Sequence, residues 1–350
     1  ILCRGTVRPF RQGSESYRKL MRRRGVAGTL WLAHDNLLER LPVGERTLHL
    51  RASERLARLP LTGDAAAVVR AMTAGDRSGL TPELRTAYSR SGLSHLLAVS
   101  GLHTGIVFVL INLLLWWLPL LRRGHLLRNL LAAAAVWCFV AAAGFPPSAV
   151  RAAVMCTLLQ AALASASEYV ALSALAAAAF GMLLWNPAWI GDVSFQLSFA
   201  AVAAILAWGV PLCRRCHTRW RAVNLLADAY LIGLAATLGT APLVSHLFGI
   251  VPLAGLLINP AAIALATVVV FGGALWLLLP LAPLAAPLAW AVGTTAEGIN
   301  ALARLVAALP GGAVEYTLGS LPTAGIYLLL AAGTLAAWCR EPKKNVLLPS

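Results

Sequence analysis

Residues 91–105 hold the side chains best suited to chemistry: two histidines and three serines stand among three glycines at the start of an apolar run. Ser100 and His103 are three residues apart, close enough on a helix for a contact that could activate the serine as a nucleophile. No acidic third member is evident nearby, and no GxSxG motif is present. His95 and His103 are eight residues apart and share a helix face, but two histidines alone are a weak metal signal.

The glycines of this stretch, Gly92, Gly101 and Gly105, support a different interpretation. Glycine permits a close backbone approach or a bend. We therefore favour a broken entrance helix whose serine and histidine side chains line a polar path. A serine nucleophile and a metal site are the alternatives.

Two charged residues lie at the starts of later apolar runs, where a charge costs roughly 2.5 kcal/mol or more and tends to face a bundle interior or a water-filled path. Arg151 follows Gly-Phe-Pro-Pro-Ser at 144–148, and Asp192 opens the run at 193–213. The two could pair. Alternatively, each is an interfacial helix-end residue, for which the helix dipole suits Asp192 better than Arg151.

Uncharged polar residues add further candidates. Ser194 and Ser198 are four residues apart and share a helix face, whereas Gln196 points elsewhere. Asn259-Pro260 predicts a helix break, because proline removes a backbone hydrogen bond. Ordinary helix packing in membranes uses the same residue types.

The composition is that of a polytopic membrane protein, with 59% hydrophobic and 12% charged residues and a mean hydropathy of +0.74. A membrane-spanning helix needs roughly 20 apolar residues. The prolines at 280, 283 and 287 divide the uncharged run at 247–296 into two helices. About nine transmembrane helices are predicted: 104–121, 130–150, 152–167, 169–191, 193–213, 229–245, the two helices that begin in the run from 247 and reach 309, and 316–339.

Short basic clusters predict the orientation of the chain. They follow the first, fifth and ninth predicted helices, so four crossings separate each cluster from the next and all three share one side. The positive-inside bias makes that side, and the C-terminus, cytoplasmic. Residues 1–92 then face outward, although they hold 17 of the 29 Lys and Arg and 8 of the 14 Asp and Glu. Such a basic segment suits nucleic acid or anionic lipid headgroups, or is simply a solvated face.

The fold class expected is an all-α membrane bundle preceded by a small β-containing remnant. Alternating residues near 25–32 and 46–51 predict strands, with a short basic helix at 18–24. Residues 1–50 form the β-containing part, 51–92 an amphipathic helical linker, 93–340 the transmembrane domain and 341–350 a basic tail. The chain begins at Ile1, and we interpret it as a piece of a longer protein.

Metal and nucleotide motifs are weak or missing. The six cysteines fit no disulfide framework, and the lone CxxC of Cys213 and Cys216 has no second CxxC to complete a zinc site. No cofactor or metal is therefore predicted. No GxxxxGK[ST] motif is present, so any ATP-driven pulling is expected from a partner protein.

The segment Gly92-Leu-Ser-His-Leu-Leu-Ala-Val-Ser-Gly-Leu-His103 closely resembles the signature of the ComEC family of competence proteins. Ala-Gly-Asp-Arg at 74–77, Gly-Phe-Pro-Pro-Ser-Ala-Val-Arg-Ala at 144–152 and Asp-Val-Ser-Phe-Gln-Leu-Ser-Phe at 192–199 resemble further family segments, in the expected order. The resemblance covers roughly residues 60–310.

The resemblance implies transport of a single DNA strand across the inner membrane during natural transformation. It also implies an OB-like outer domain, of which residues 1–50 could be the C-terminal part. The expected partners are the DNA strand, the lipid bilayer and other competence proteins, namely a DNA receptor and a cytoplasmic ATPase or helicase, and whether the chain forms a homo-oligomer is left open. The residues to which the resemblance gives functional weight are His95, Ser100, His103, Arg151, Asp192, Gln196 and Ser198.

One departure from the family limits what is carried over. Many members have a metallo-β-lactamase-like domain with an HxHxDH motif, which this sequence lacks, so no enzymatic activity is assigned to it. Two rival functions remain. One is transport of another anionic solute, such as a lipid-linked or nucleotide species, and the other is an intramembrane hydrolase that uses Ser100 and His103.

Overall fold

The computed structural model of the chain describes residues 2–3, 7–9, 28–30, 37–39, 47–118, 124–164, 170–278, 283, 285–309 and 311–340. Near the N-terminus, β1 (Leu2–Cys3) pairs with β4 (Leu37–Glu39), and β2 (Val7–Pro9) pairs with β3 (Gly28–Leu30), both antiparallel. The strand predicted near 25–32 is thus present at 28–30. The basic helix predicted at 18–24 and the tail at 341–350 lie outside the described residues, and the OB-like assignment stays a prediction.

The strand predicted at 46–51 is wrong, because helix α2 (Leu48–Leu56) occupies most of that segment. The Thr47 side chain caps it by accepting a hydrogen bond from the Leu50 amide at 3.4 Å. Ala52 and Leu56, four residues apart, are its buried residues, whereas Leu48 and Leu50 are exposed. The helical period of burial therefore prevails over the short alternation of leucines.

The segment predicted as a linker continues with α3 (Gly63–Ala74) and α4 (Pro82–Arg90), and these helices belong to the core. Proline at the first position of α4 follows the N-cap Thr81, as predicted for this helix start. The Tyr88 hydroxyl donates to the Asn300 side-chain oxygen at 2.8 Å, and both residues are buried. Arg304 and Asp64 form an ion pair at the surface nearby.

Asp76, in the turn after α3, ties that turn to α2. Its carboxylate accepts hydrogen bonds from the hydroxyls of Ser53 at 2.5 Å and Ser78 at 2.6 Å. Partial burial alone would raise the pKa of Asp76. The hydrogen bonds from the two serines and the nearby Arg70 guanidinium outweigh that effect and lower the pKa to about 2.

Each predicted apolar run contains a helix. The helices are α5 (Gly101–Leu114), α6 (Gly124–Ala142), α7 (Pro147–Ala164), α8 (Ala171–Trp185), α9 (Val193–Ala204), the π-helical η5 (Ile205–Gly209), α10 (Val210–Cys216), α11 (Arg221–Phe248), α12 (Gly255–Leu278), α13 (Ala285–Ala307) and α14 (Ser320–Arg340). Among the described residues, four helices are long and apolar enough to cross a membrane. They are α6, the continuous helix made of α9, η5 and α10, the separate helix α11, and α12. Shorter apolar helices are α5, α8 and the helix at residues 320–334. These are the helices of a membrane protein, and the count of nine crossings stays a prediction.

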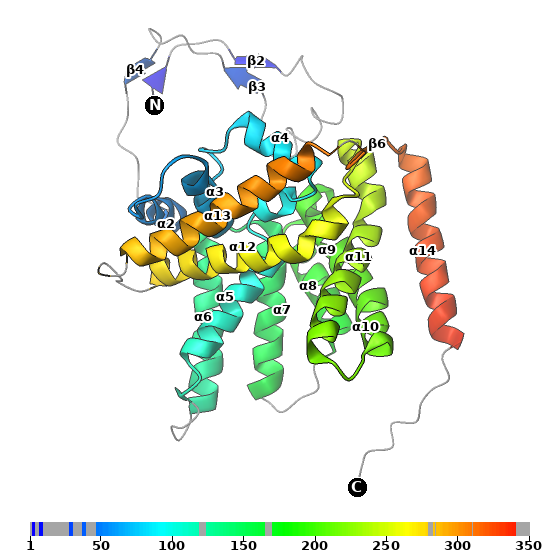
Figure 1. The fold of residues 1–350 in the computed structure, drawn as a ribbon. Coiled ribbons are helices and arrows are strands. Elements are labelled where there is room, and N and C mark those ends of the chain that lie inside the picture. Colours follow the sequence, from blue (N-terminus) through cyan, green and yellow to red (C-terminus); the bar gives the residue numbers. More distant parts are fainter. Residues whose placement is uncertain are drawn as a thin grey trace.

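The helices do not all run in one direction. In Figure 1, α12 and α13 run across the view, whereas α6, α7, α11 and α14 run roughly from top to bottom. Helix α12 ends at Leu278 and α13 begins at Ala285, so the uncharged run is divided into two helices as predicted. Both helices pack against α3, and α12 also packs against α5 and α11. This transverse pair therefore joins the N-terminal helices to the bundle.

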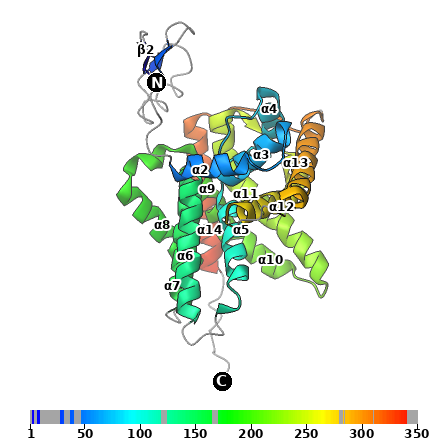
Figure 2. The same cartoon turned by 90° about the vertical axis from the view of Figure 1, so that its left-hand side faces the viewer.

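The helix ends beside the three basic clusters lie at one end of the molecule, the lower end in Figure 1. They are the start of α6, the turn between α10 and α11, and the end of α14. Helices α2 to α4 lie at the other end, and Figure 2 shows α2 above the far end of α6. His49 of α2 contacts the Ala142 carbonyl there, with its Nδ1 at 2.9 Å. The orientation of the chain in the membrane stays a prediction.

The helix break predicted at Asn259-Pro260 is wrong, because α12 continues through both residues. Pro260 is the sixth residue of α12, so the intrahelical acceptor that loses its donor is the Leu256 carbonyl in the first turn. A short antiparallel pair, β5 (Ile250–Val251) and β6 (Val314–Glu315), closes the loops before α12 and α14.

Candidate functional site

The stretch at 91–105 is interrupted in the way its glycines and serines predict. The 3₁₀ helix η2 (Ser94–Leu97) ends at Ala98, whose backbone is extended with φ −113° and ψ 143°. Ser100 is also extended, and α5 begins after it. Gly92 has a φ of +80°, and a side chain there would press on Pro252 and Gly255. The stretch is thus a turn, a short extended link and then a helix.

Ser100 and His103 do not form a nucleophile–base pair. The Ser100 hydroxyl accepts a hydrogen bond from the backbone amide of His103 at 3.4 Å, which is an N-cap contact. The His103 imidazole is fully buried, and neither ring nitrogen has a hydrogen-bond partner in the described part of the chain. It lies beside the Met72 carbonyl without the geometry of a hydrogen bond. Within the described residues, His103 is therefore a buried polar side chain whose two ring nitrogens have no hydrogen-bond partner.

Arg151 of α7 is the centre of the site. Its Nε donates to the Ser198 hydroxyl of α9 at 2.8 Å, and its guanidinium carbon lies 5.8 Å from the centre of the Phe199 ring. A methyl group on Gly101 of α5 would overlap the guanidinium, so glycine makes room for it. The side chain is 6% exposed, and within the described residues it makes no ion pair with a carboxylate.

Two further hydrogen bonds join the neighbouring motifs. The Ser148 hydroxyl of α7 donates to the Val99 carbonyl at 2.9 Å. The Arg77 Nε donates to the Leu97 carbonyl, also at 2.9 Å. All four sequence motifs therefore meet around the start of α5.

The other predicted residues take local structural positions. Asp192 caps α9 by accepting from the Phe195 amide at 3.1 Å, and among the described residues it does not pair with Arg151 as the sequence suggested it could. Gln196 donates to the Ile190 carbonyl at 2.8 Å and so holds the preceding 3₁₀ helix η4 (Pro187–Gly191). The His95 Nδ1 lies 3.0 Å from the Gly92 carbonyl, on an exposed side chain.

A buried guanidinium without a carboxylate partner is electrostatically incomplete. Burying a charge is costly unless an opposite charge and hydrogen bonds compensate for it. Beyond the bond to Ser198 and the contact with the Phe199 ring, the described residues give the Arg151 side chain one weak polar contact, from Nη1 to the Met155 sulfur at 3.7 Å. A planar guanidinium with unused N–H groups matches phosphate oxygens well. The site can therefore accept an anion at the meeting point of α5, α7 and α9.

The sequence did not single out Ser148, Gly101 or Phe199 as site residues, although each lies in a recognised segment. The motif positions could have suggested them, but their contacts depend on how α5, α7 and α9 pack.

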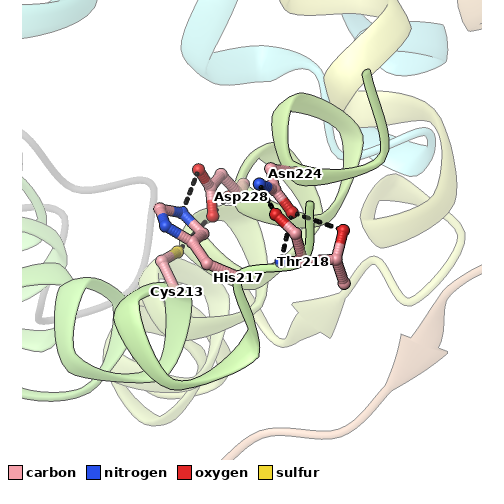
Figure 3. Close-up of polar contacts among 5 residues, drawn as sticks. All are labelled: Cys213, His217, Thr218, Asn224 and Asp228. Carbon is pink, nitrogen blue, oxygen red and sulfur yellow. Dashed lines mark hydrogen bonds and ion pairs between the residues drawn. The ribbon is translucent and has the colours of Figure 1, made fainter. Parts of the chain in front are cut away.

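The CxxC segment ends α10, and a separate polar turn follows it before α11, drawn in Figure 3. The His217 Nε2 lies 3.2 Å from a carboxylate oxygen of Asp228, and Asn224 binds the backbone and hydroxyl of Thr218. The buried Cys213 points toward the Asp228 carbonyl. In the described ranges, no group of three or more His, Cys, Asp and Glu residues is arranged to hold a metal. These contacts fasten the turn.

The fold and the site are those of a membrane protein in which, within the part of the chain that the structure describes, a buried arginine without a carboxylate partner lies where the sequence motifs converge. Residues 72–343 match the family described as "Competence protein". The chain belongs to this family, which confirms the resemblance to the ComEC competence proteins.

A curated relative supports this assignment. The chain is 30% identical over 188 residues to "ComE operon protein 3" of Bacillus subtilis (strain 168), a match that covers 54% of this chain. The match spans 23% of that protein, well under half of its length. No solved structure matches the chain.

Proposed function

We propose that this chain is the membrane part of a DNA-uptake protein, which passes a single DNA strand across the cytoplasmic membrane during natural transformation. The observation that carries the proposal is the convergence of the family motifs on Arg151. Three helices place a buried cation, a hydroxyl and an aromatic ring within contact of one another there.

These groups suit a single strand. The phosphates dominate the affinity of proteins for nucleic acid, and a guanidinium offers them paired donors. Aromatic rings provide surfaces on which bases stack without regard to sequence. Arg151 and Phe199 would serve these two purposes, with Ser198 holding the guanidinium in place.

The proposal includes an orientation and partners. Residues 1–92 lie outside the cytoplasmic membrane and present a basic approach, and the C-terminus lies in the cytoplasm. A DNA receptor delivers the strand, and a cytoplasmic ATPase or helicase supplies the energy. No nuclease step is assigned to this chain.

The test uses the full-length protein in competent cells, with Arg151→Ala, Arg151→Lys and, as a matched control, Arg219→Ala. Arg219 is exposed and lies over the Trp220 ring, away from the site. After membrane levels are checked, entry of labelled DNA into the cytoplasm and transformation are measured. We expect a loss of at least about tenfold for Arg151→Ala, because a charge-assisted contact is worth about 1.5–3 kcal/mol.

Arg151→Lys keeps the charge but loses the planar fork, so it should retain part of the activity. Wild-type DNA entry in Arg151→Ala would contradict a strand path that runs past Arg151. Loss of entry in Arg219→Ala to the same extent would also count against it, because the effect would then not be specific to the site.

A further inference from the structure

A second polar cluster lies inside the bundle, away from Arg151, at Asn112 of α5, Asn129 of α6 and Gln160 of α7, which we name the amide site. The Gln160 Nε2 donates to the Asn112 Oδ1 at 3.2 Å, and the Asn129 Nδ2 lies 3.5 Å from the backbone carbonyl oxygen of Gln160. Asn129 is 6% exposed and Gln160 is 3% exposed. Three helices therefore bring uncharged amides together in a packed interior.

The amides satisfy one another only in part. The side-chain oxygens of Asn129 and Gln160 are buried and accept no hydrogen bond from the described part of the chain. Polar residues that act only as helix–helix glue pair with each other or with the backbone, because unmet polar atoms are costly in a dry interior. Two unmet acceptors on residues that contact each other point to a hydrogen-bond donor that is brought in from outside the chain.

The amide site lies on the same helices as the Arg151 site. Arg151 and Gln160 are nine residues apart on α7, as are His103 and Asn112 on α5. Nine residues of α-helix rise about 13.5 Å. Between the two levels, the Trp137 Nε1 of α6 donates to the Thr157 hydroxyl of α7 at 3.1 Å. Polar side chains therefore continue along α5, α6 and α7 toward the end with the basic clusters.

We propose that the amide site is a second contact point for the passing strand, and that it binds the amino groups of the nucleobases; this inference rests on the proposed function. The amide oxygens accept hydrogen bonds, as the exocyclic amino groups of bases require. The site carries no charge of its own, so it would hold phosphate poorly. A path needs sites that bind weakly enough to release, and a neutral site beyond a cationic one meets that need.

The test stalls a strand in the path by attaching a bulky protein to the trailing end of the DNA. The strand carries a thiol-reactive group on its bases. Gln160→Cys or Asn112→Cys is placed in a full-length protein without its native cysteines that still supports transformation. Leu158→Cys is the matched control, because Leu158 is on the same helix but is 36% exposed on another face.

We expect the Gln160→Cys or Asn112→Cys protein to form a covalent adduct at least about tenfold above that of the Leu158→Cys protein. Asn129→Leu should slow DNA entry about threefold to tenfold without changing the amount of protein in the membrane. No adduct in either amide-site variant, with DNA entry still normal, would overturn the inference. An adduct no greater than that of the control would do the same.

The outcomes separate this inference from the proposed function. Loss of DNA entry in Arg151→Ala together with no adduct at the amide site would leave the proposed function standing and remove the second contact point. Normal entry in Arg151→Ala would remove the strand path past Arg151, whatever happens at the amide site.

Discussion

Gly101→Ala tests whether Arg151 acts from the position in which it is found. The added methyl group would overlap the end of the Arg151 guanidinium, whereas its next neighbour, the Ala152 methyl carbon, lies at an ordinary 3.5 Å. The obstacle is thus the tip of a side chain and not the backbone. We therefore expect α5 to form normally and Arg151 to be displaced from Ser198.

The magnitude follows from the contact that is lost. A hydrogen bond to a charged group contributes about 1.5–3 kcal/mol, so displacement should lower the population of the Arg151–Ser198 arrangement by about tenfold to 150-fold. Alanine at a helical position is itself favourable relative to glycine by up to about 1 kcal/mol. Uptake should therefore fall by about tenfold or more, while the free energy of unfolding falls by about 0.5–2 kcal/mol if the alanine gain is realised in full.

Gly105→Ala is the matched control, because it is on the same helix and a methyl group there meets nothing within 4 Å. Both variants are compared for membrane level, thermal unfolding in detergent and entry of labelled DNA. Equal DNA entry in the two variants would refute the reasoning, as would a loss in Gly101→Ala that merely follows a loss of folded protein.

Three further predictions concern stability in detergent. Asp76→Asn should lower the free energy of unfolding by about 1 kcal/mol at pH 7, after solvent screening is allowed for. Because the pKa of Asp76 is lowered in the folded state, its stabilisation is present above about pH 4 and should vanish as the pH falls toward 2. Unfolding curves of the two proteins at several pH values would show this. Tyr88→Phe should lower the free energy of unfolding by about 1–3 kcal/mol, because the buried Asn300 oxygen loses its donor, and adding Asn300→Leu should restore most of it in a denaturant titration. Gly239→Ala should destabilise by about 1–3 kcal/mol, because the methyl group would overlap an alanine of α9 and lie 3.2 Å from a carbonyl oxygen, whereas Gly233→Ala, with open space around it, should melt like the wild type.

Much of the helical architecture follows from the sequence. Long uncharged runs have few ways to satisfy their backbone other than as helices, so each predicted run contains one. The direction in which each helix runs does not follow from the sequence in this way. Helix α12 is apolar over its whole length, and nothing in its pattern indicates that it lies across the other helices. The break predicted at Pro260 is wrong for a similar reason, because a proline near a helix start removes one hydrogen bond and need not end the helix.

The sequence singled out Arg151 and Ser198 but did not predict the contact between them. The recognised segments contain Arg151 and Ser198, yet an arginine and an aspartate suggest an ion pair, whereas the structure gives Arg151 a hydroxyl partner. The amide site was missed altogether. Asn112 and Gln160 are 48 residues apart in the chain and each alone resembles ordinary helix-packing residues, so only the packing of α5 against α7 brings them together.

The most direct measurement is whether the strand touches the site during uptake. A stalled strand with a thiol-reactive group on its phosphates is offered to full-length protein that carries Ser198→Cys and lacks its native cysteines. Leu184→Cys on α8, where the side chain is 74% exposed, is the control. We predict a covalent adduct with the Ser198→Cys protein and none with the Leu184→Cys protein. DNA entry that proceeds with no adduct in the Ser198→Cys protein, or with equal adducts in both variants, would contradict a path that runs past Arg151.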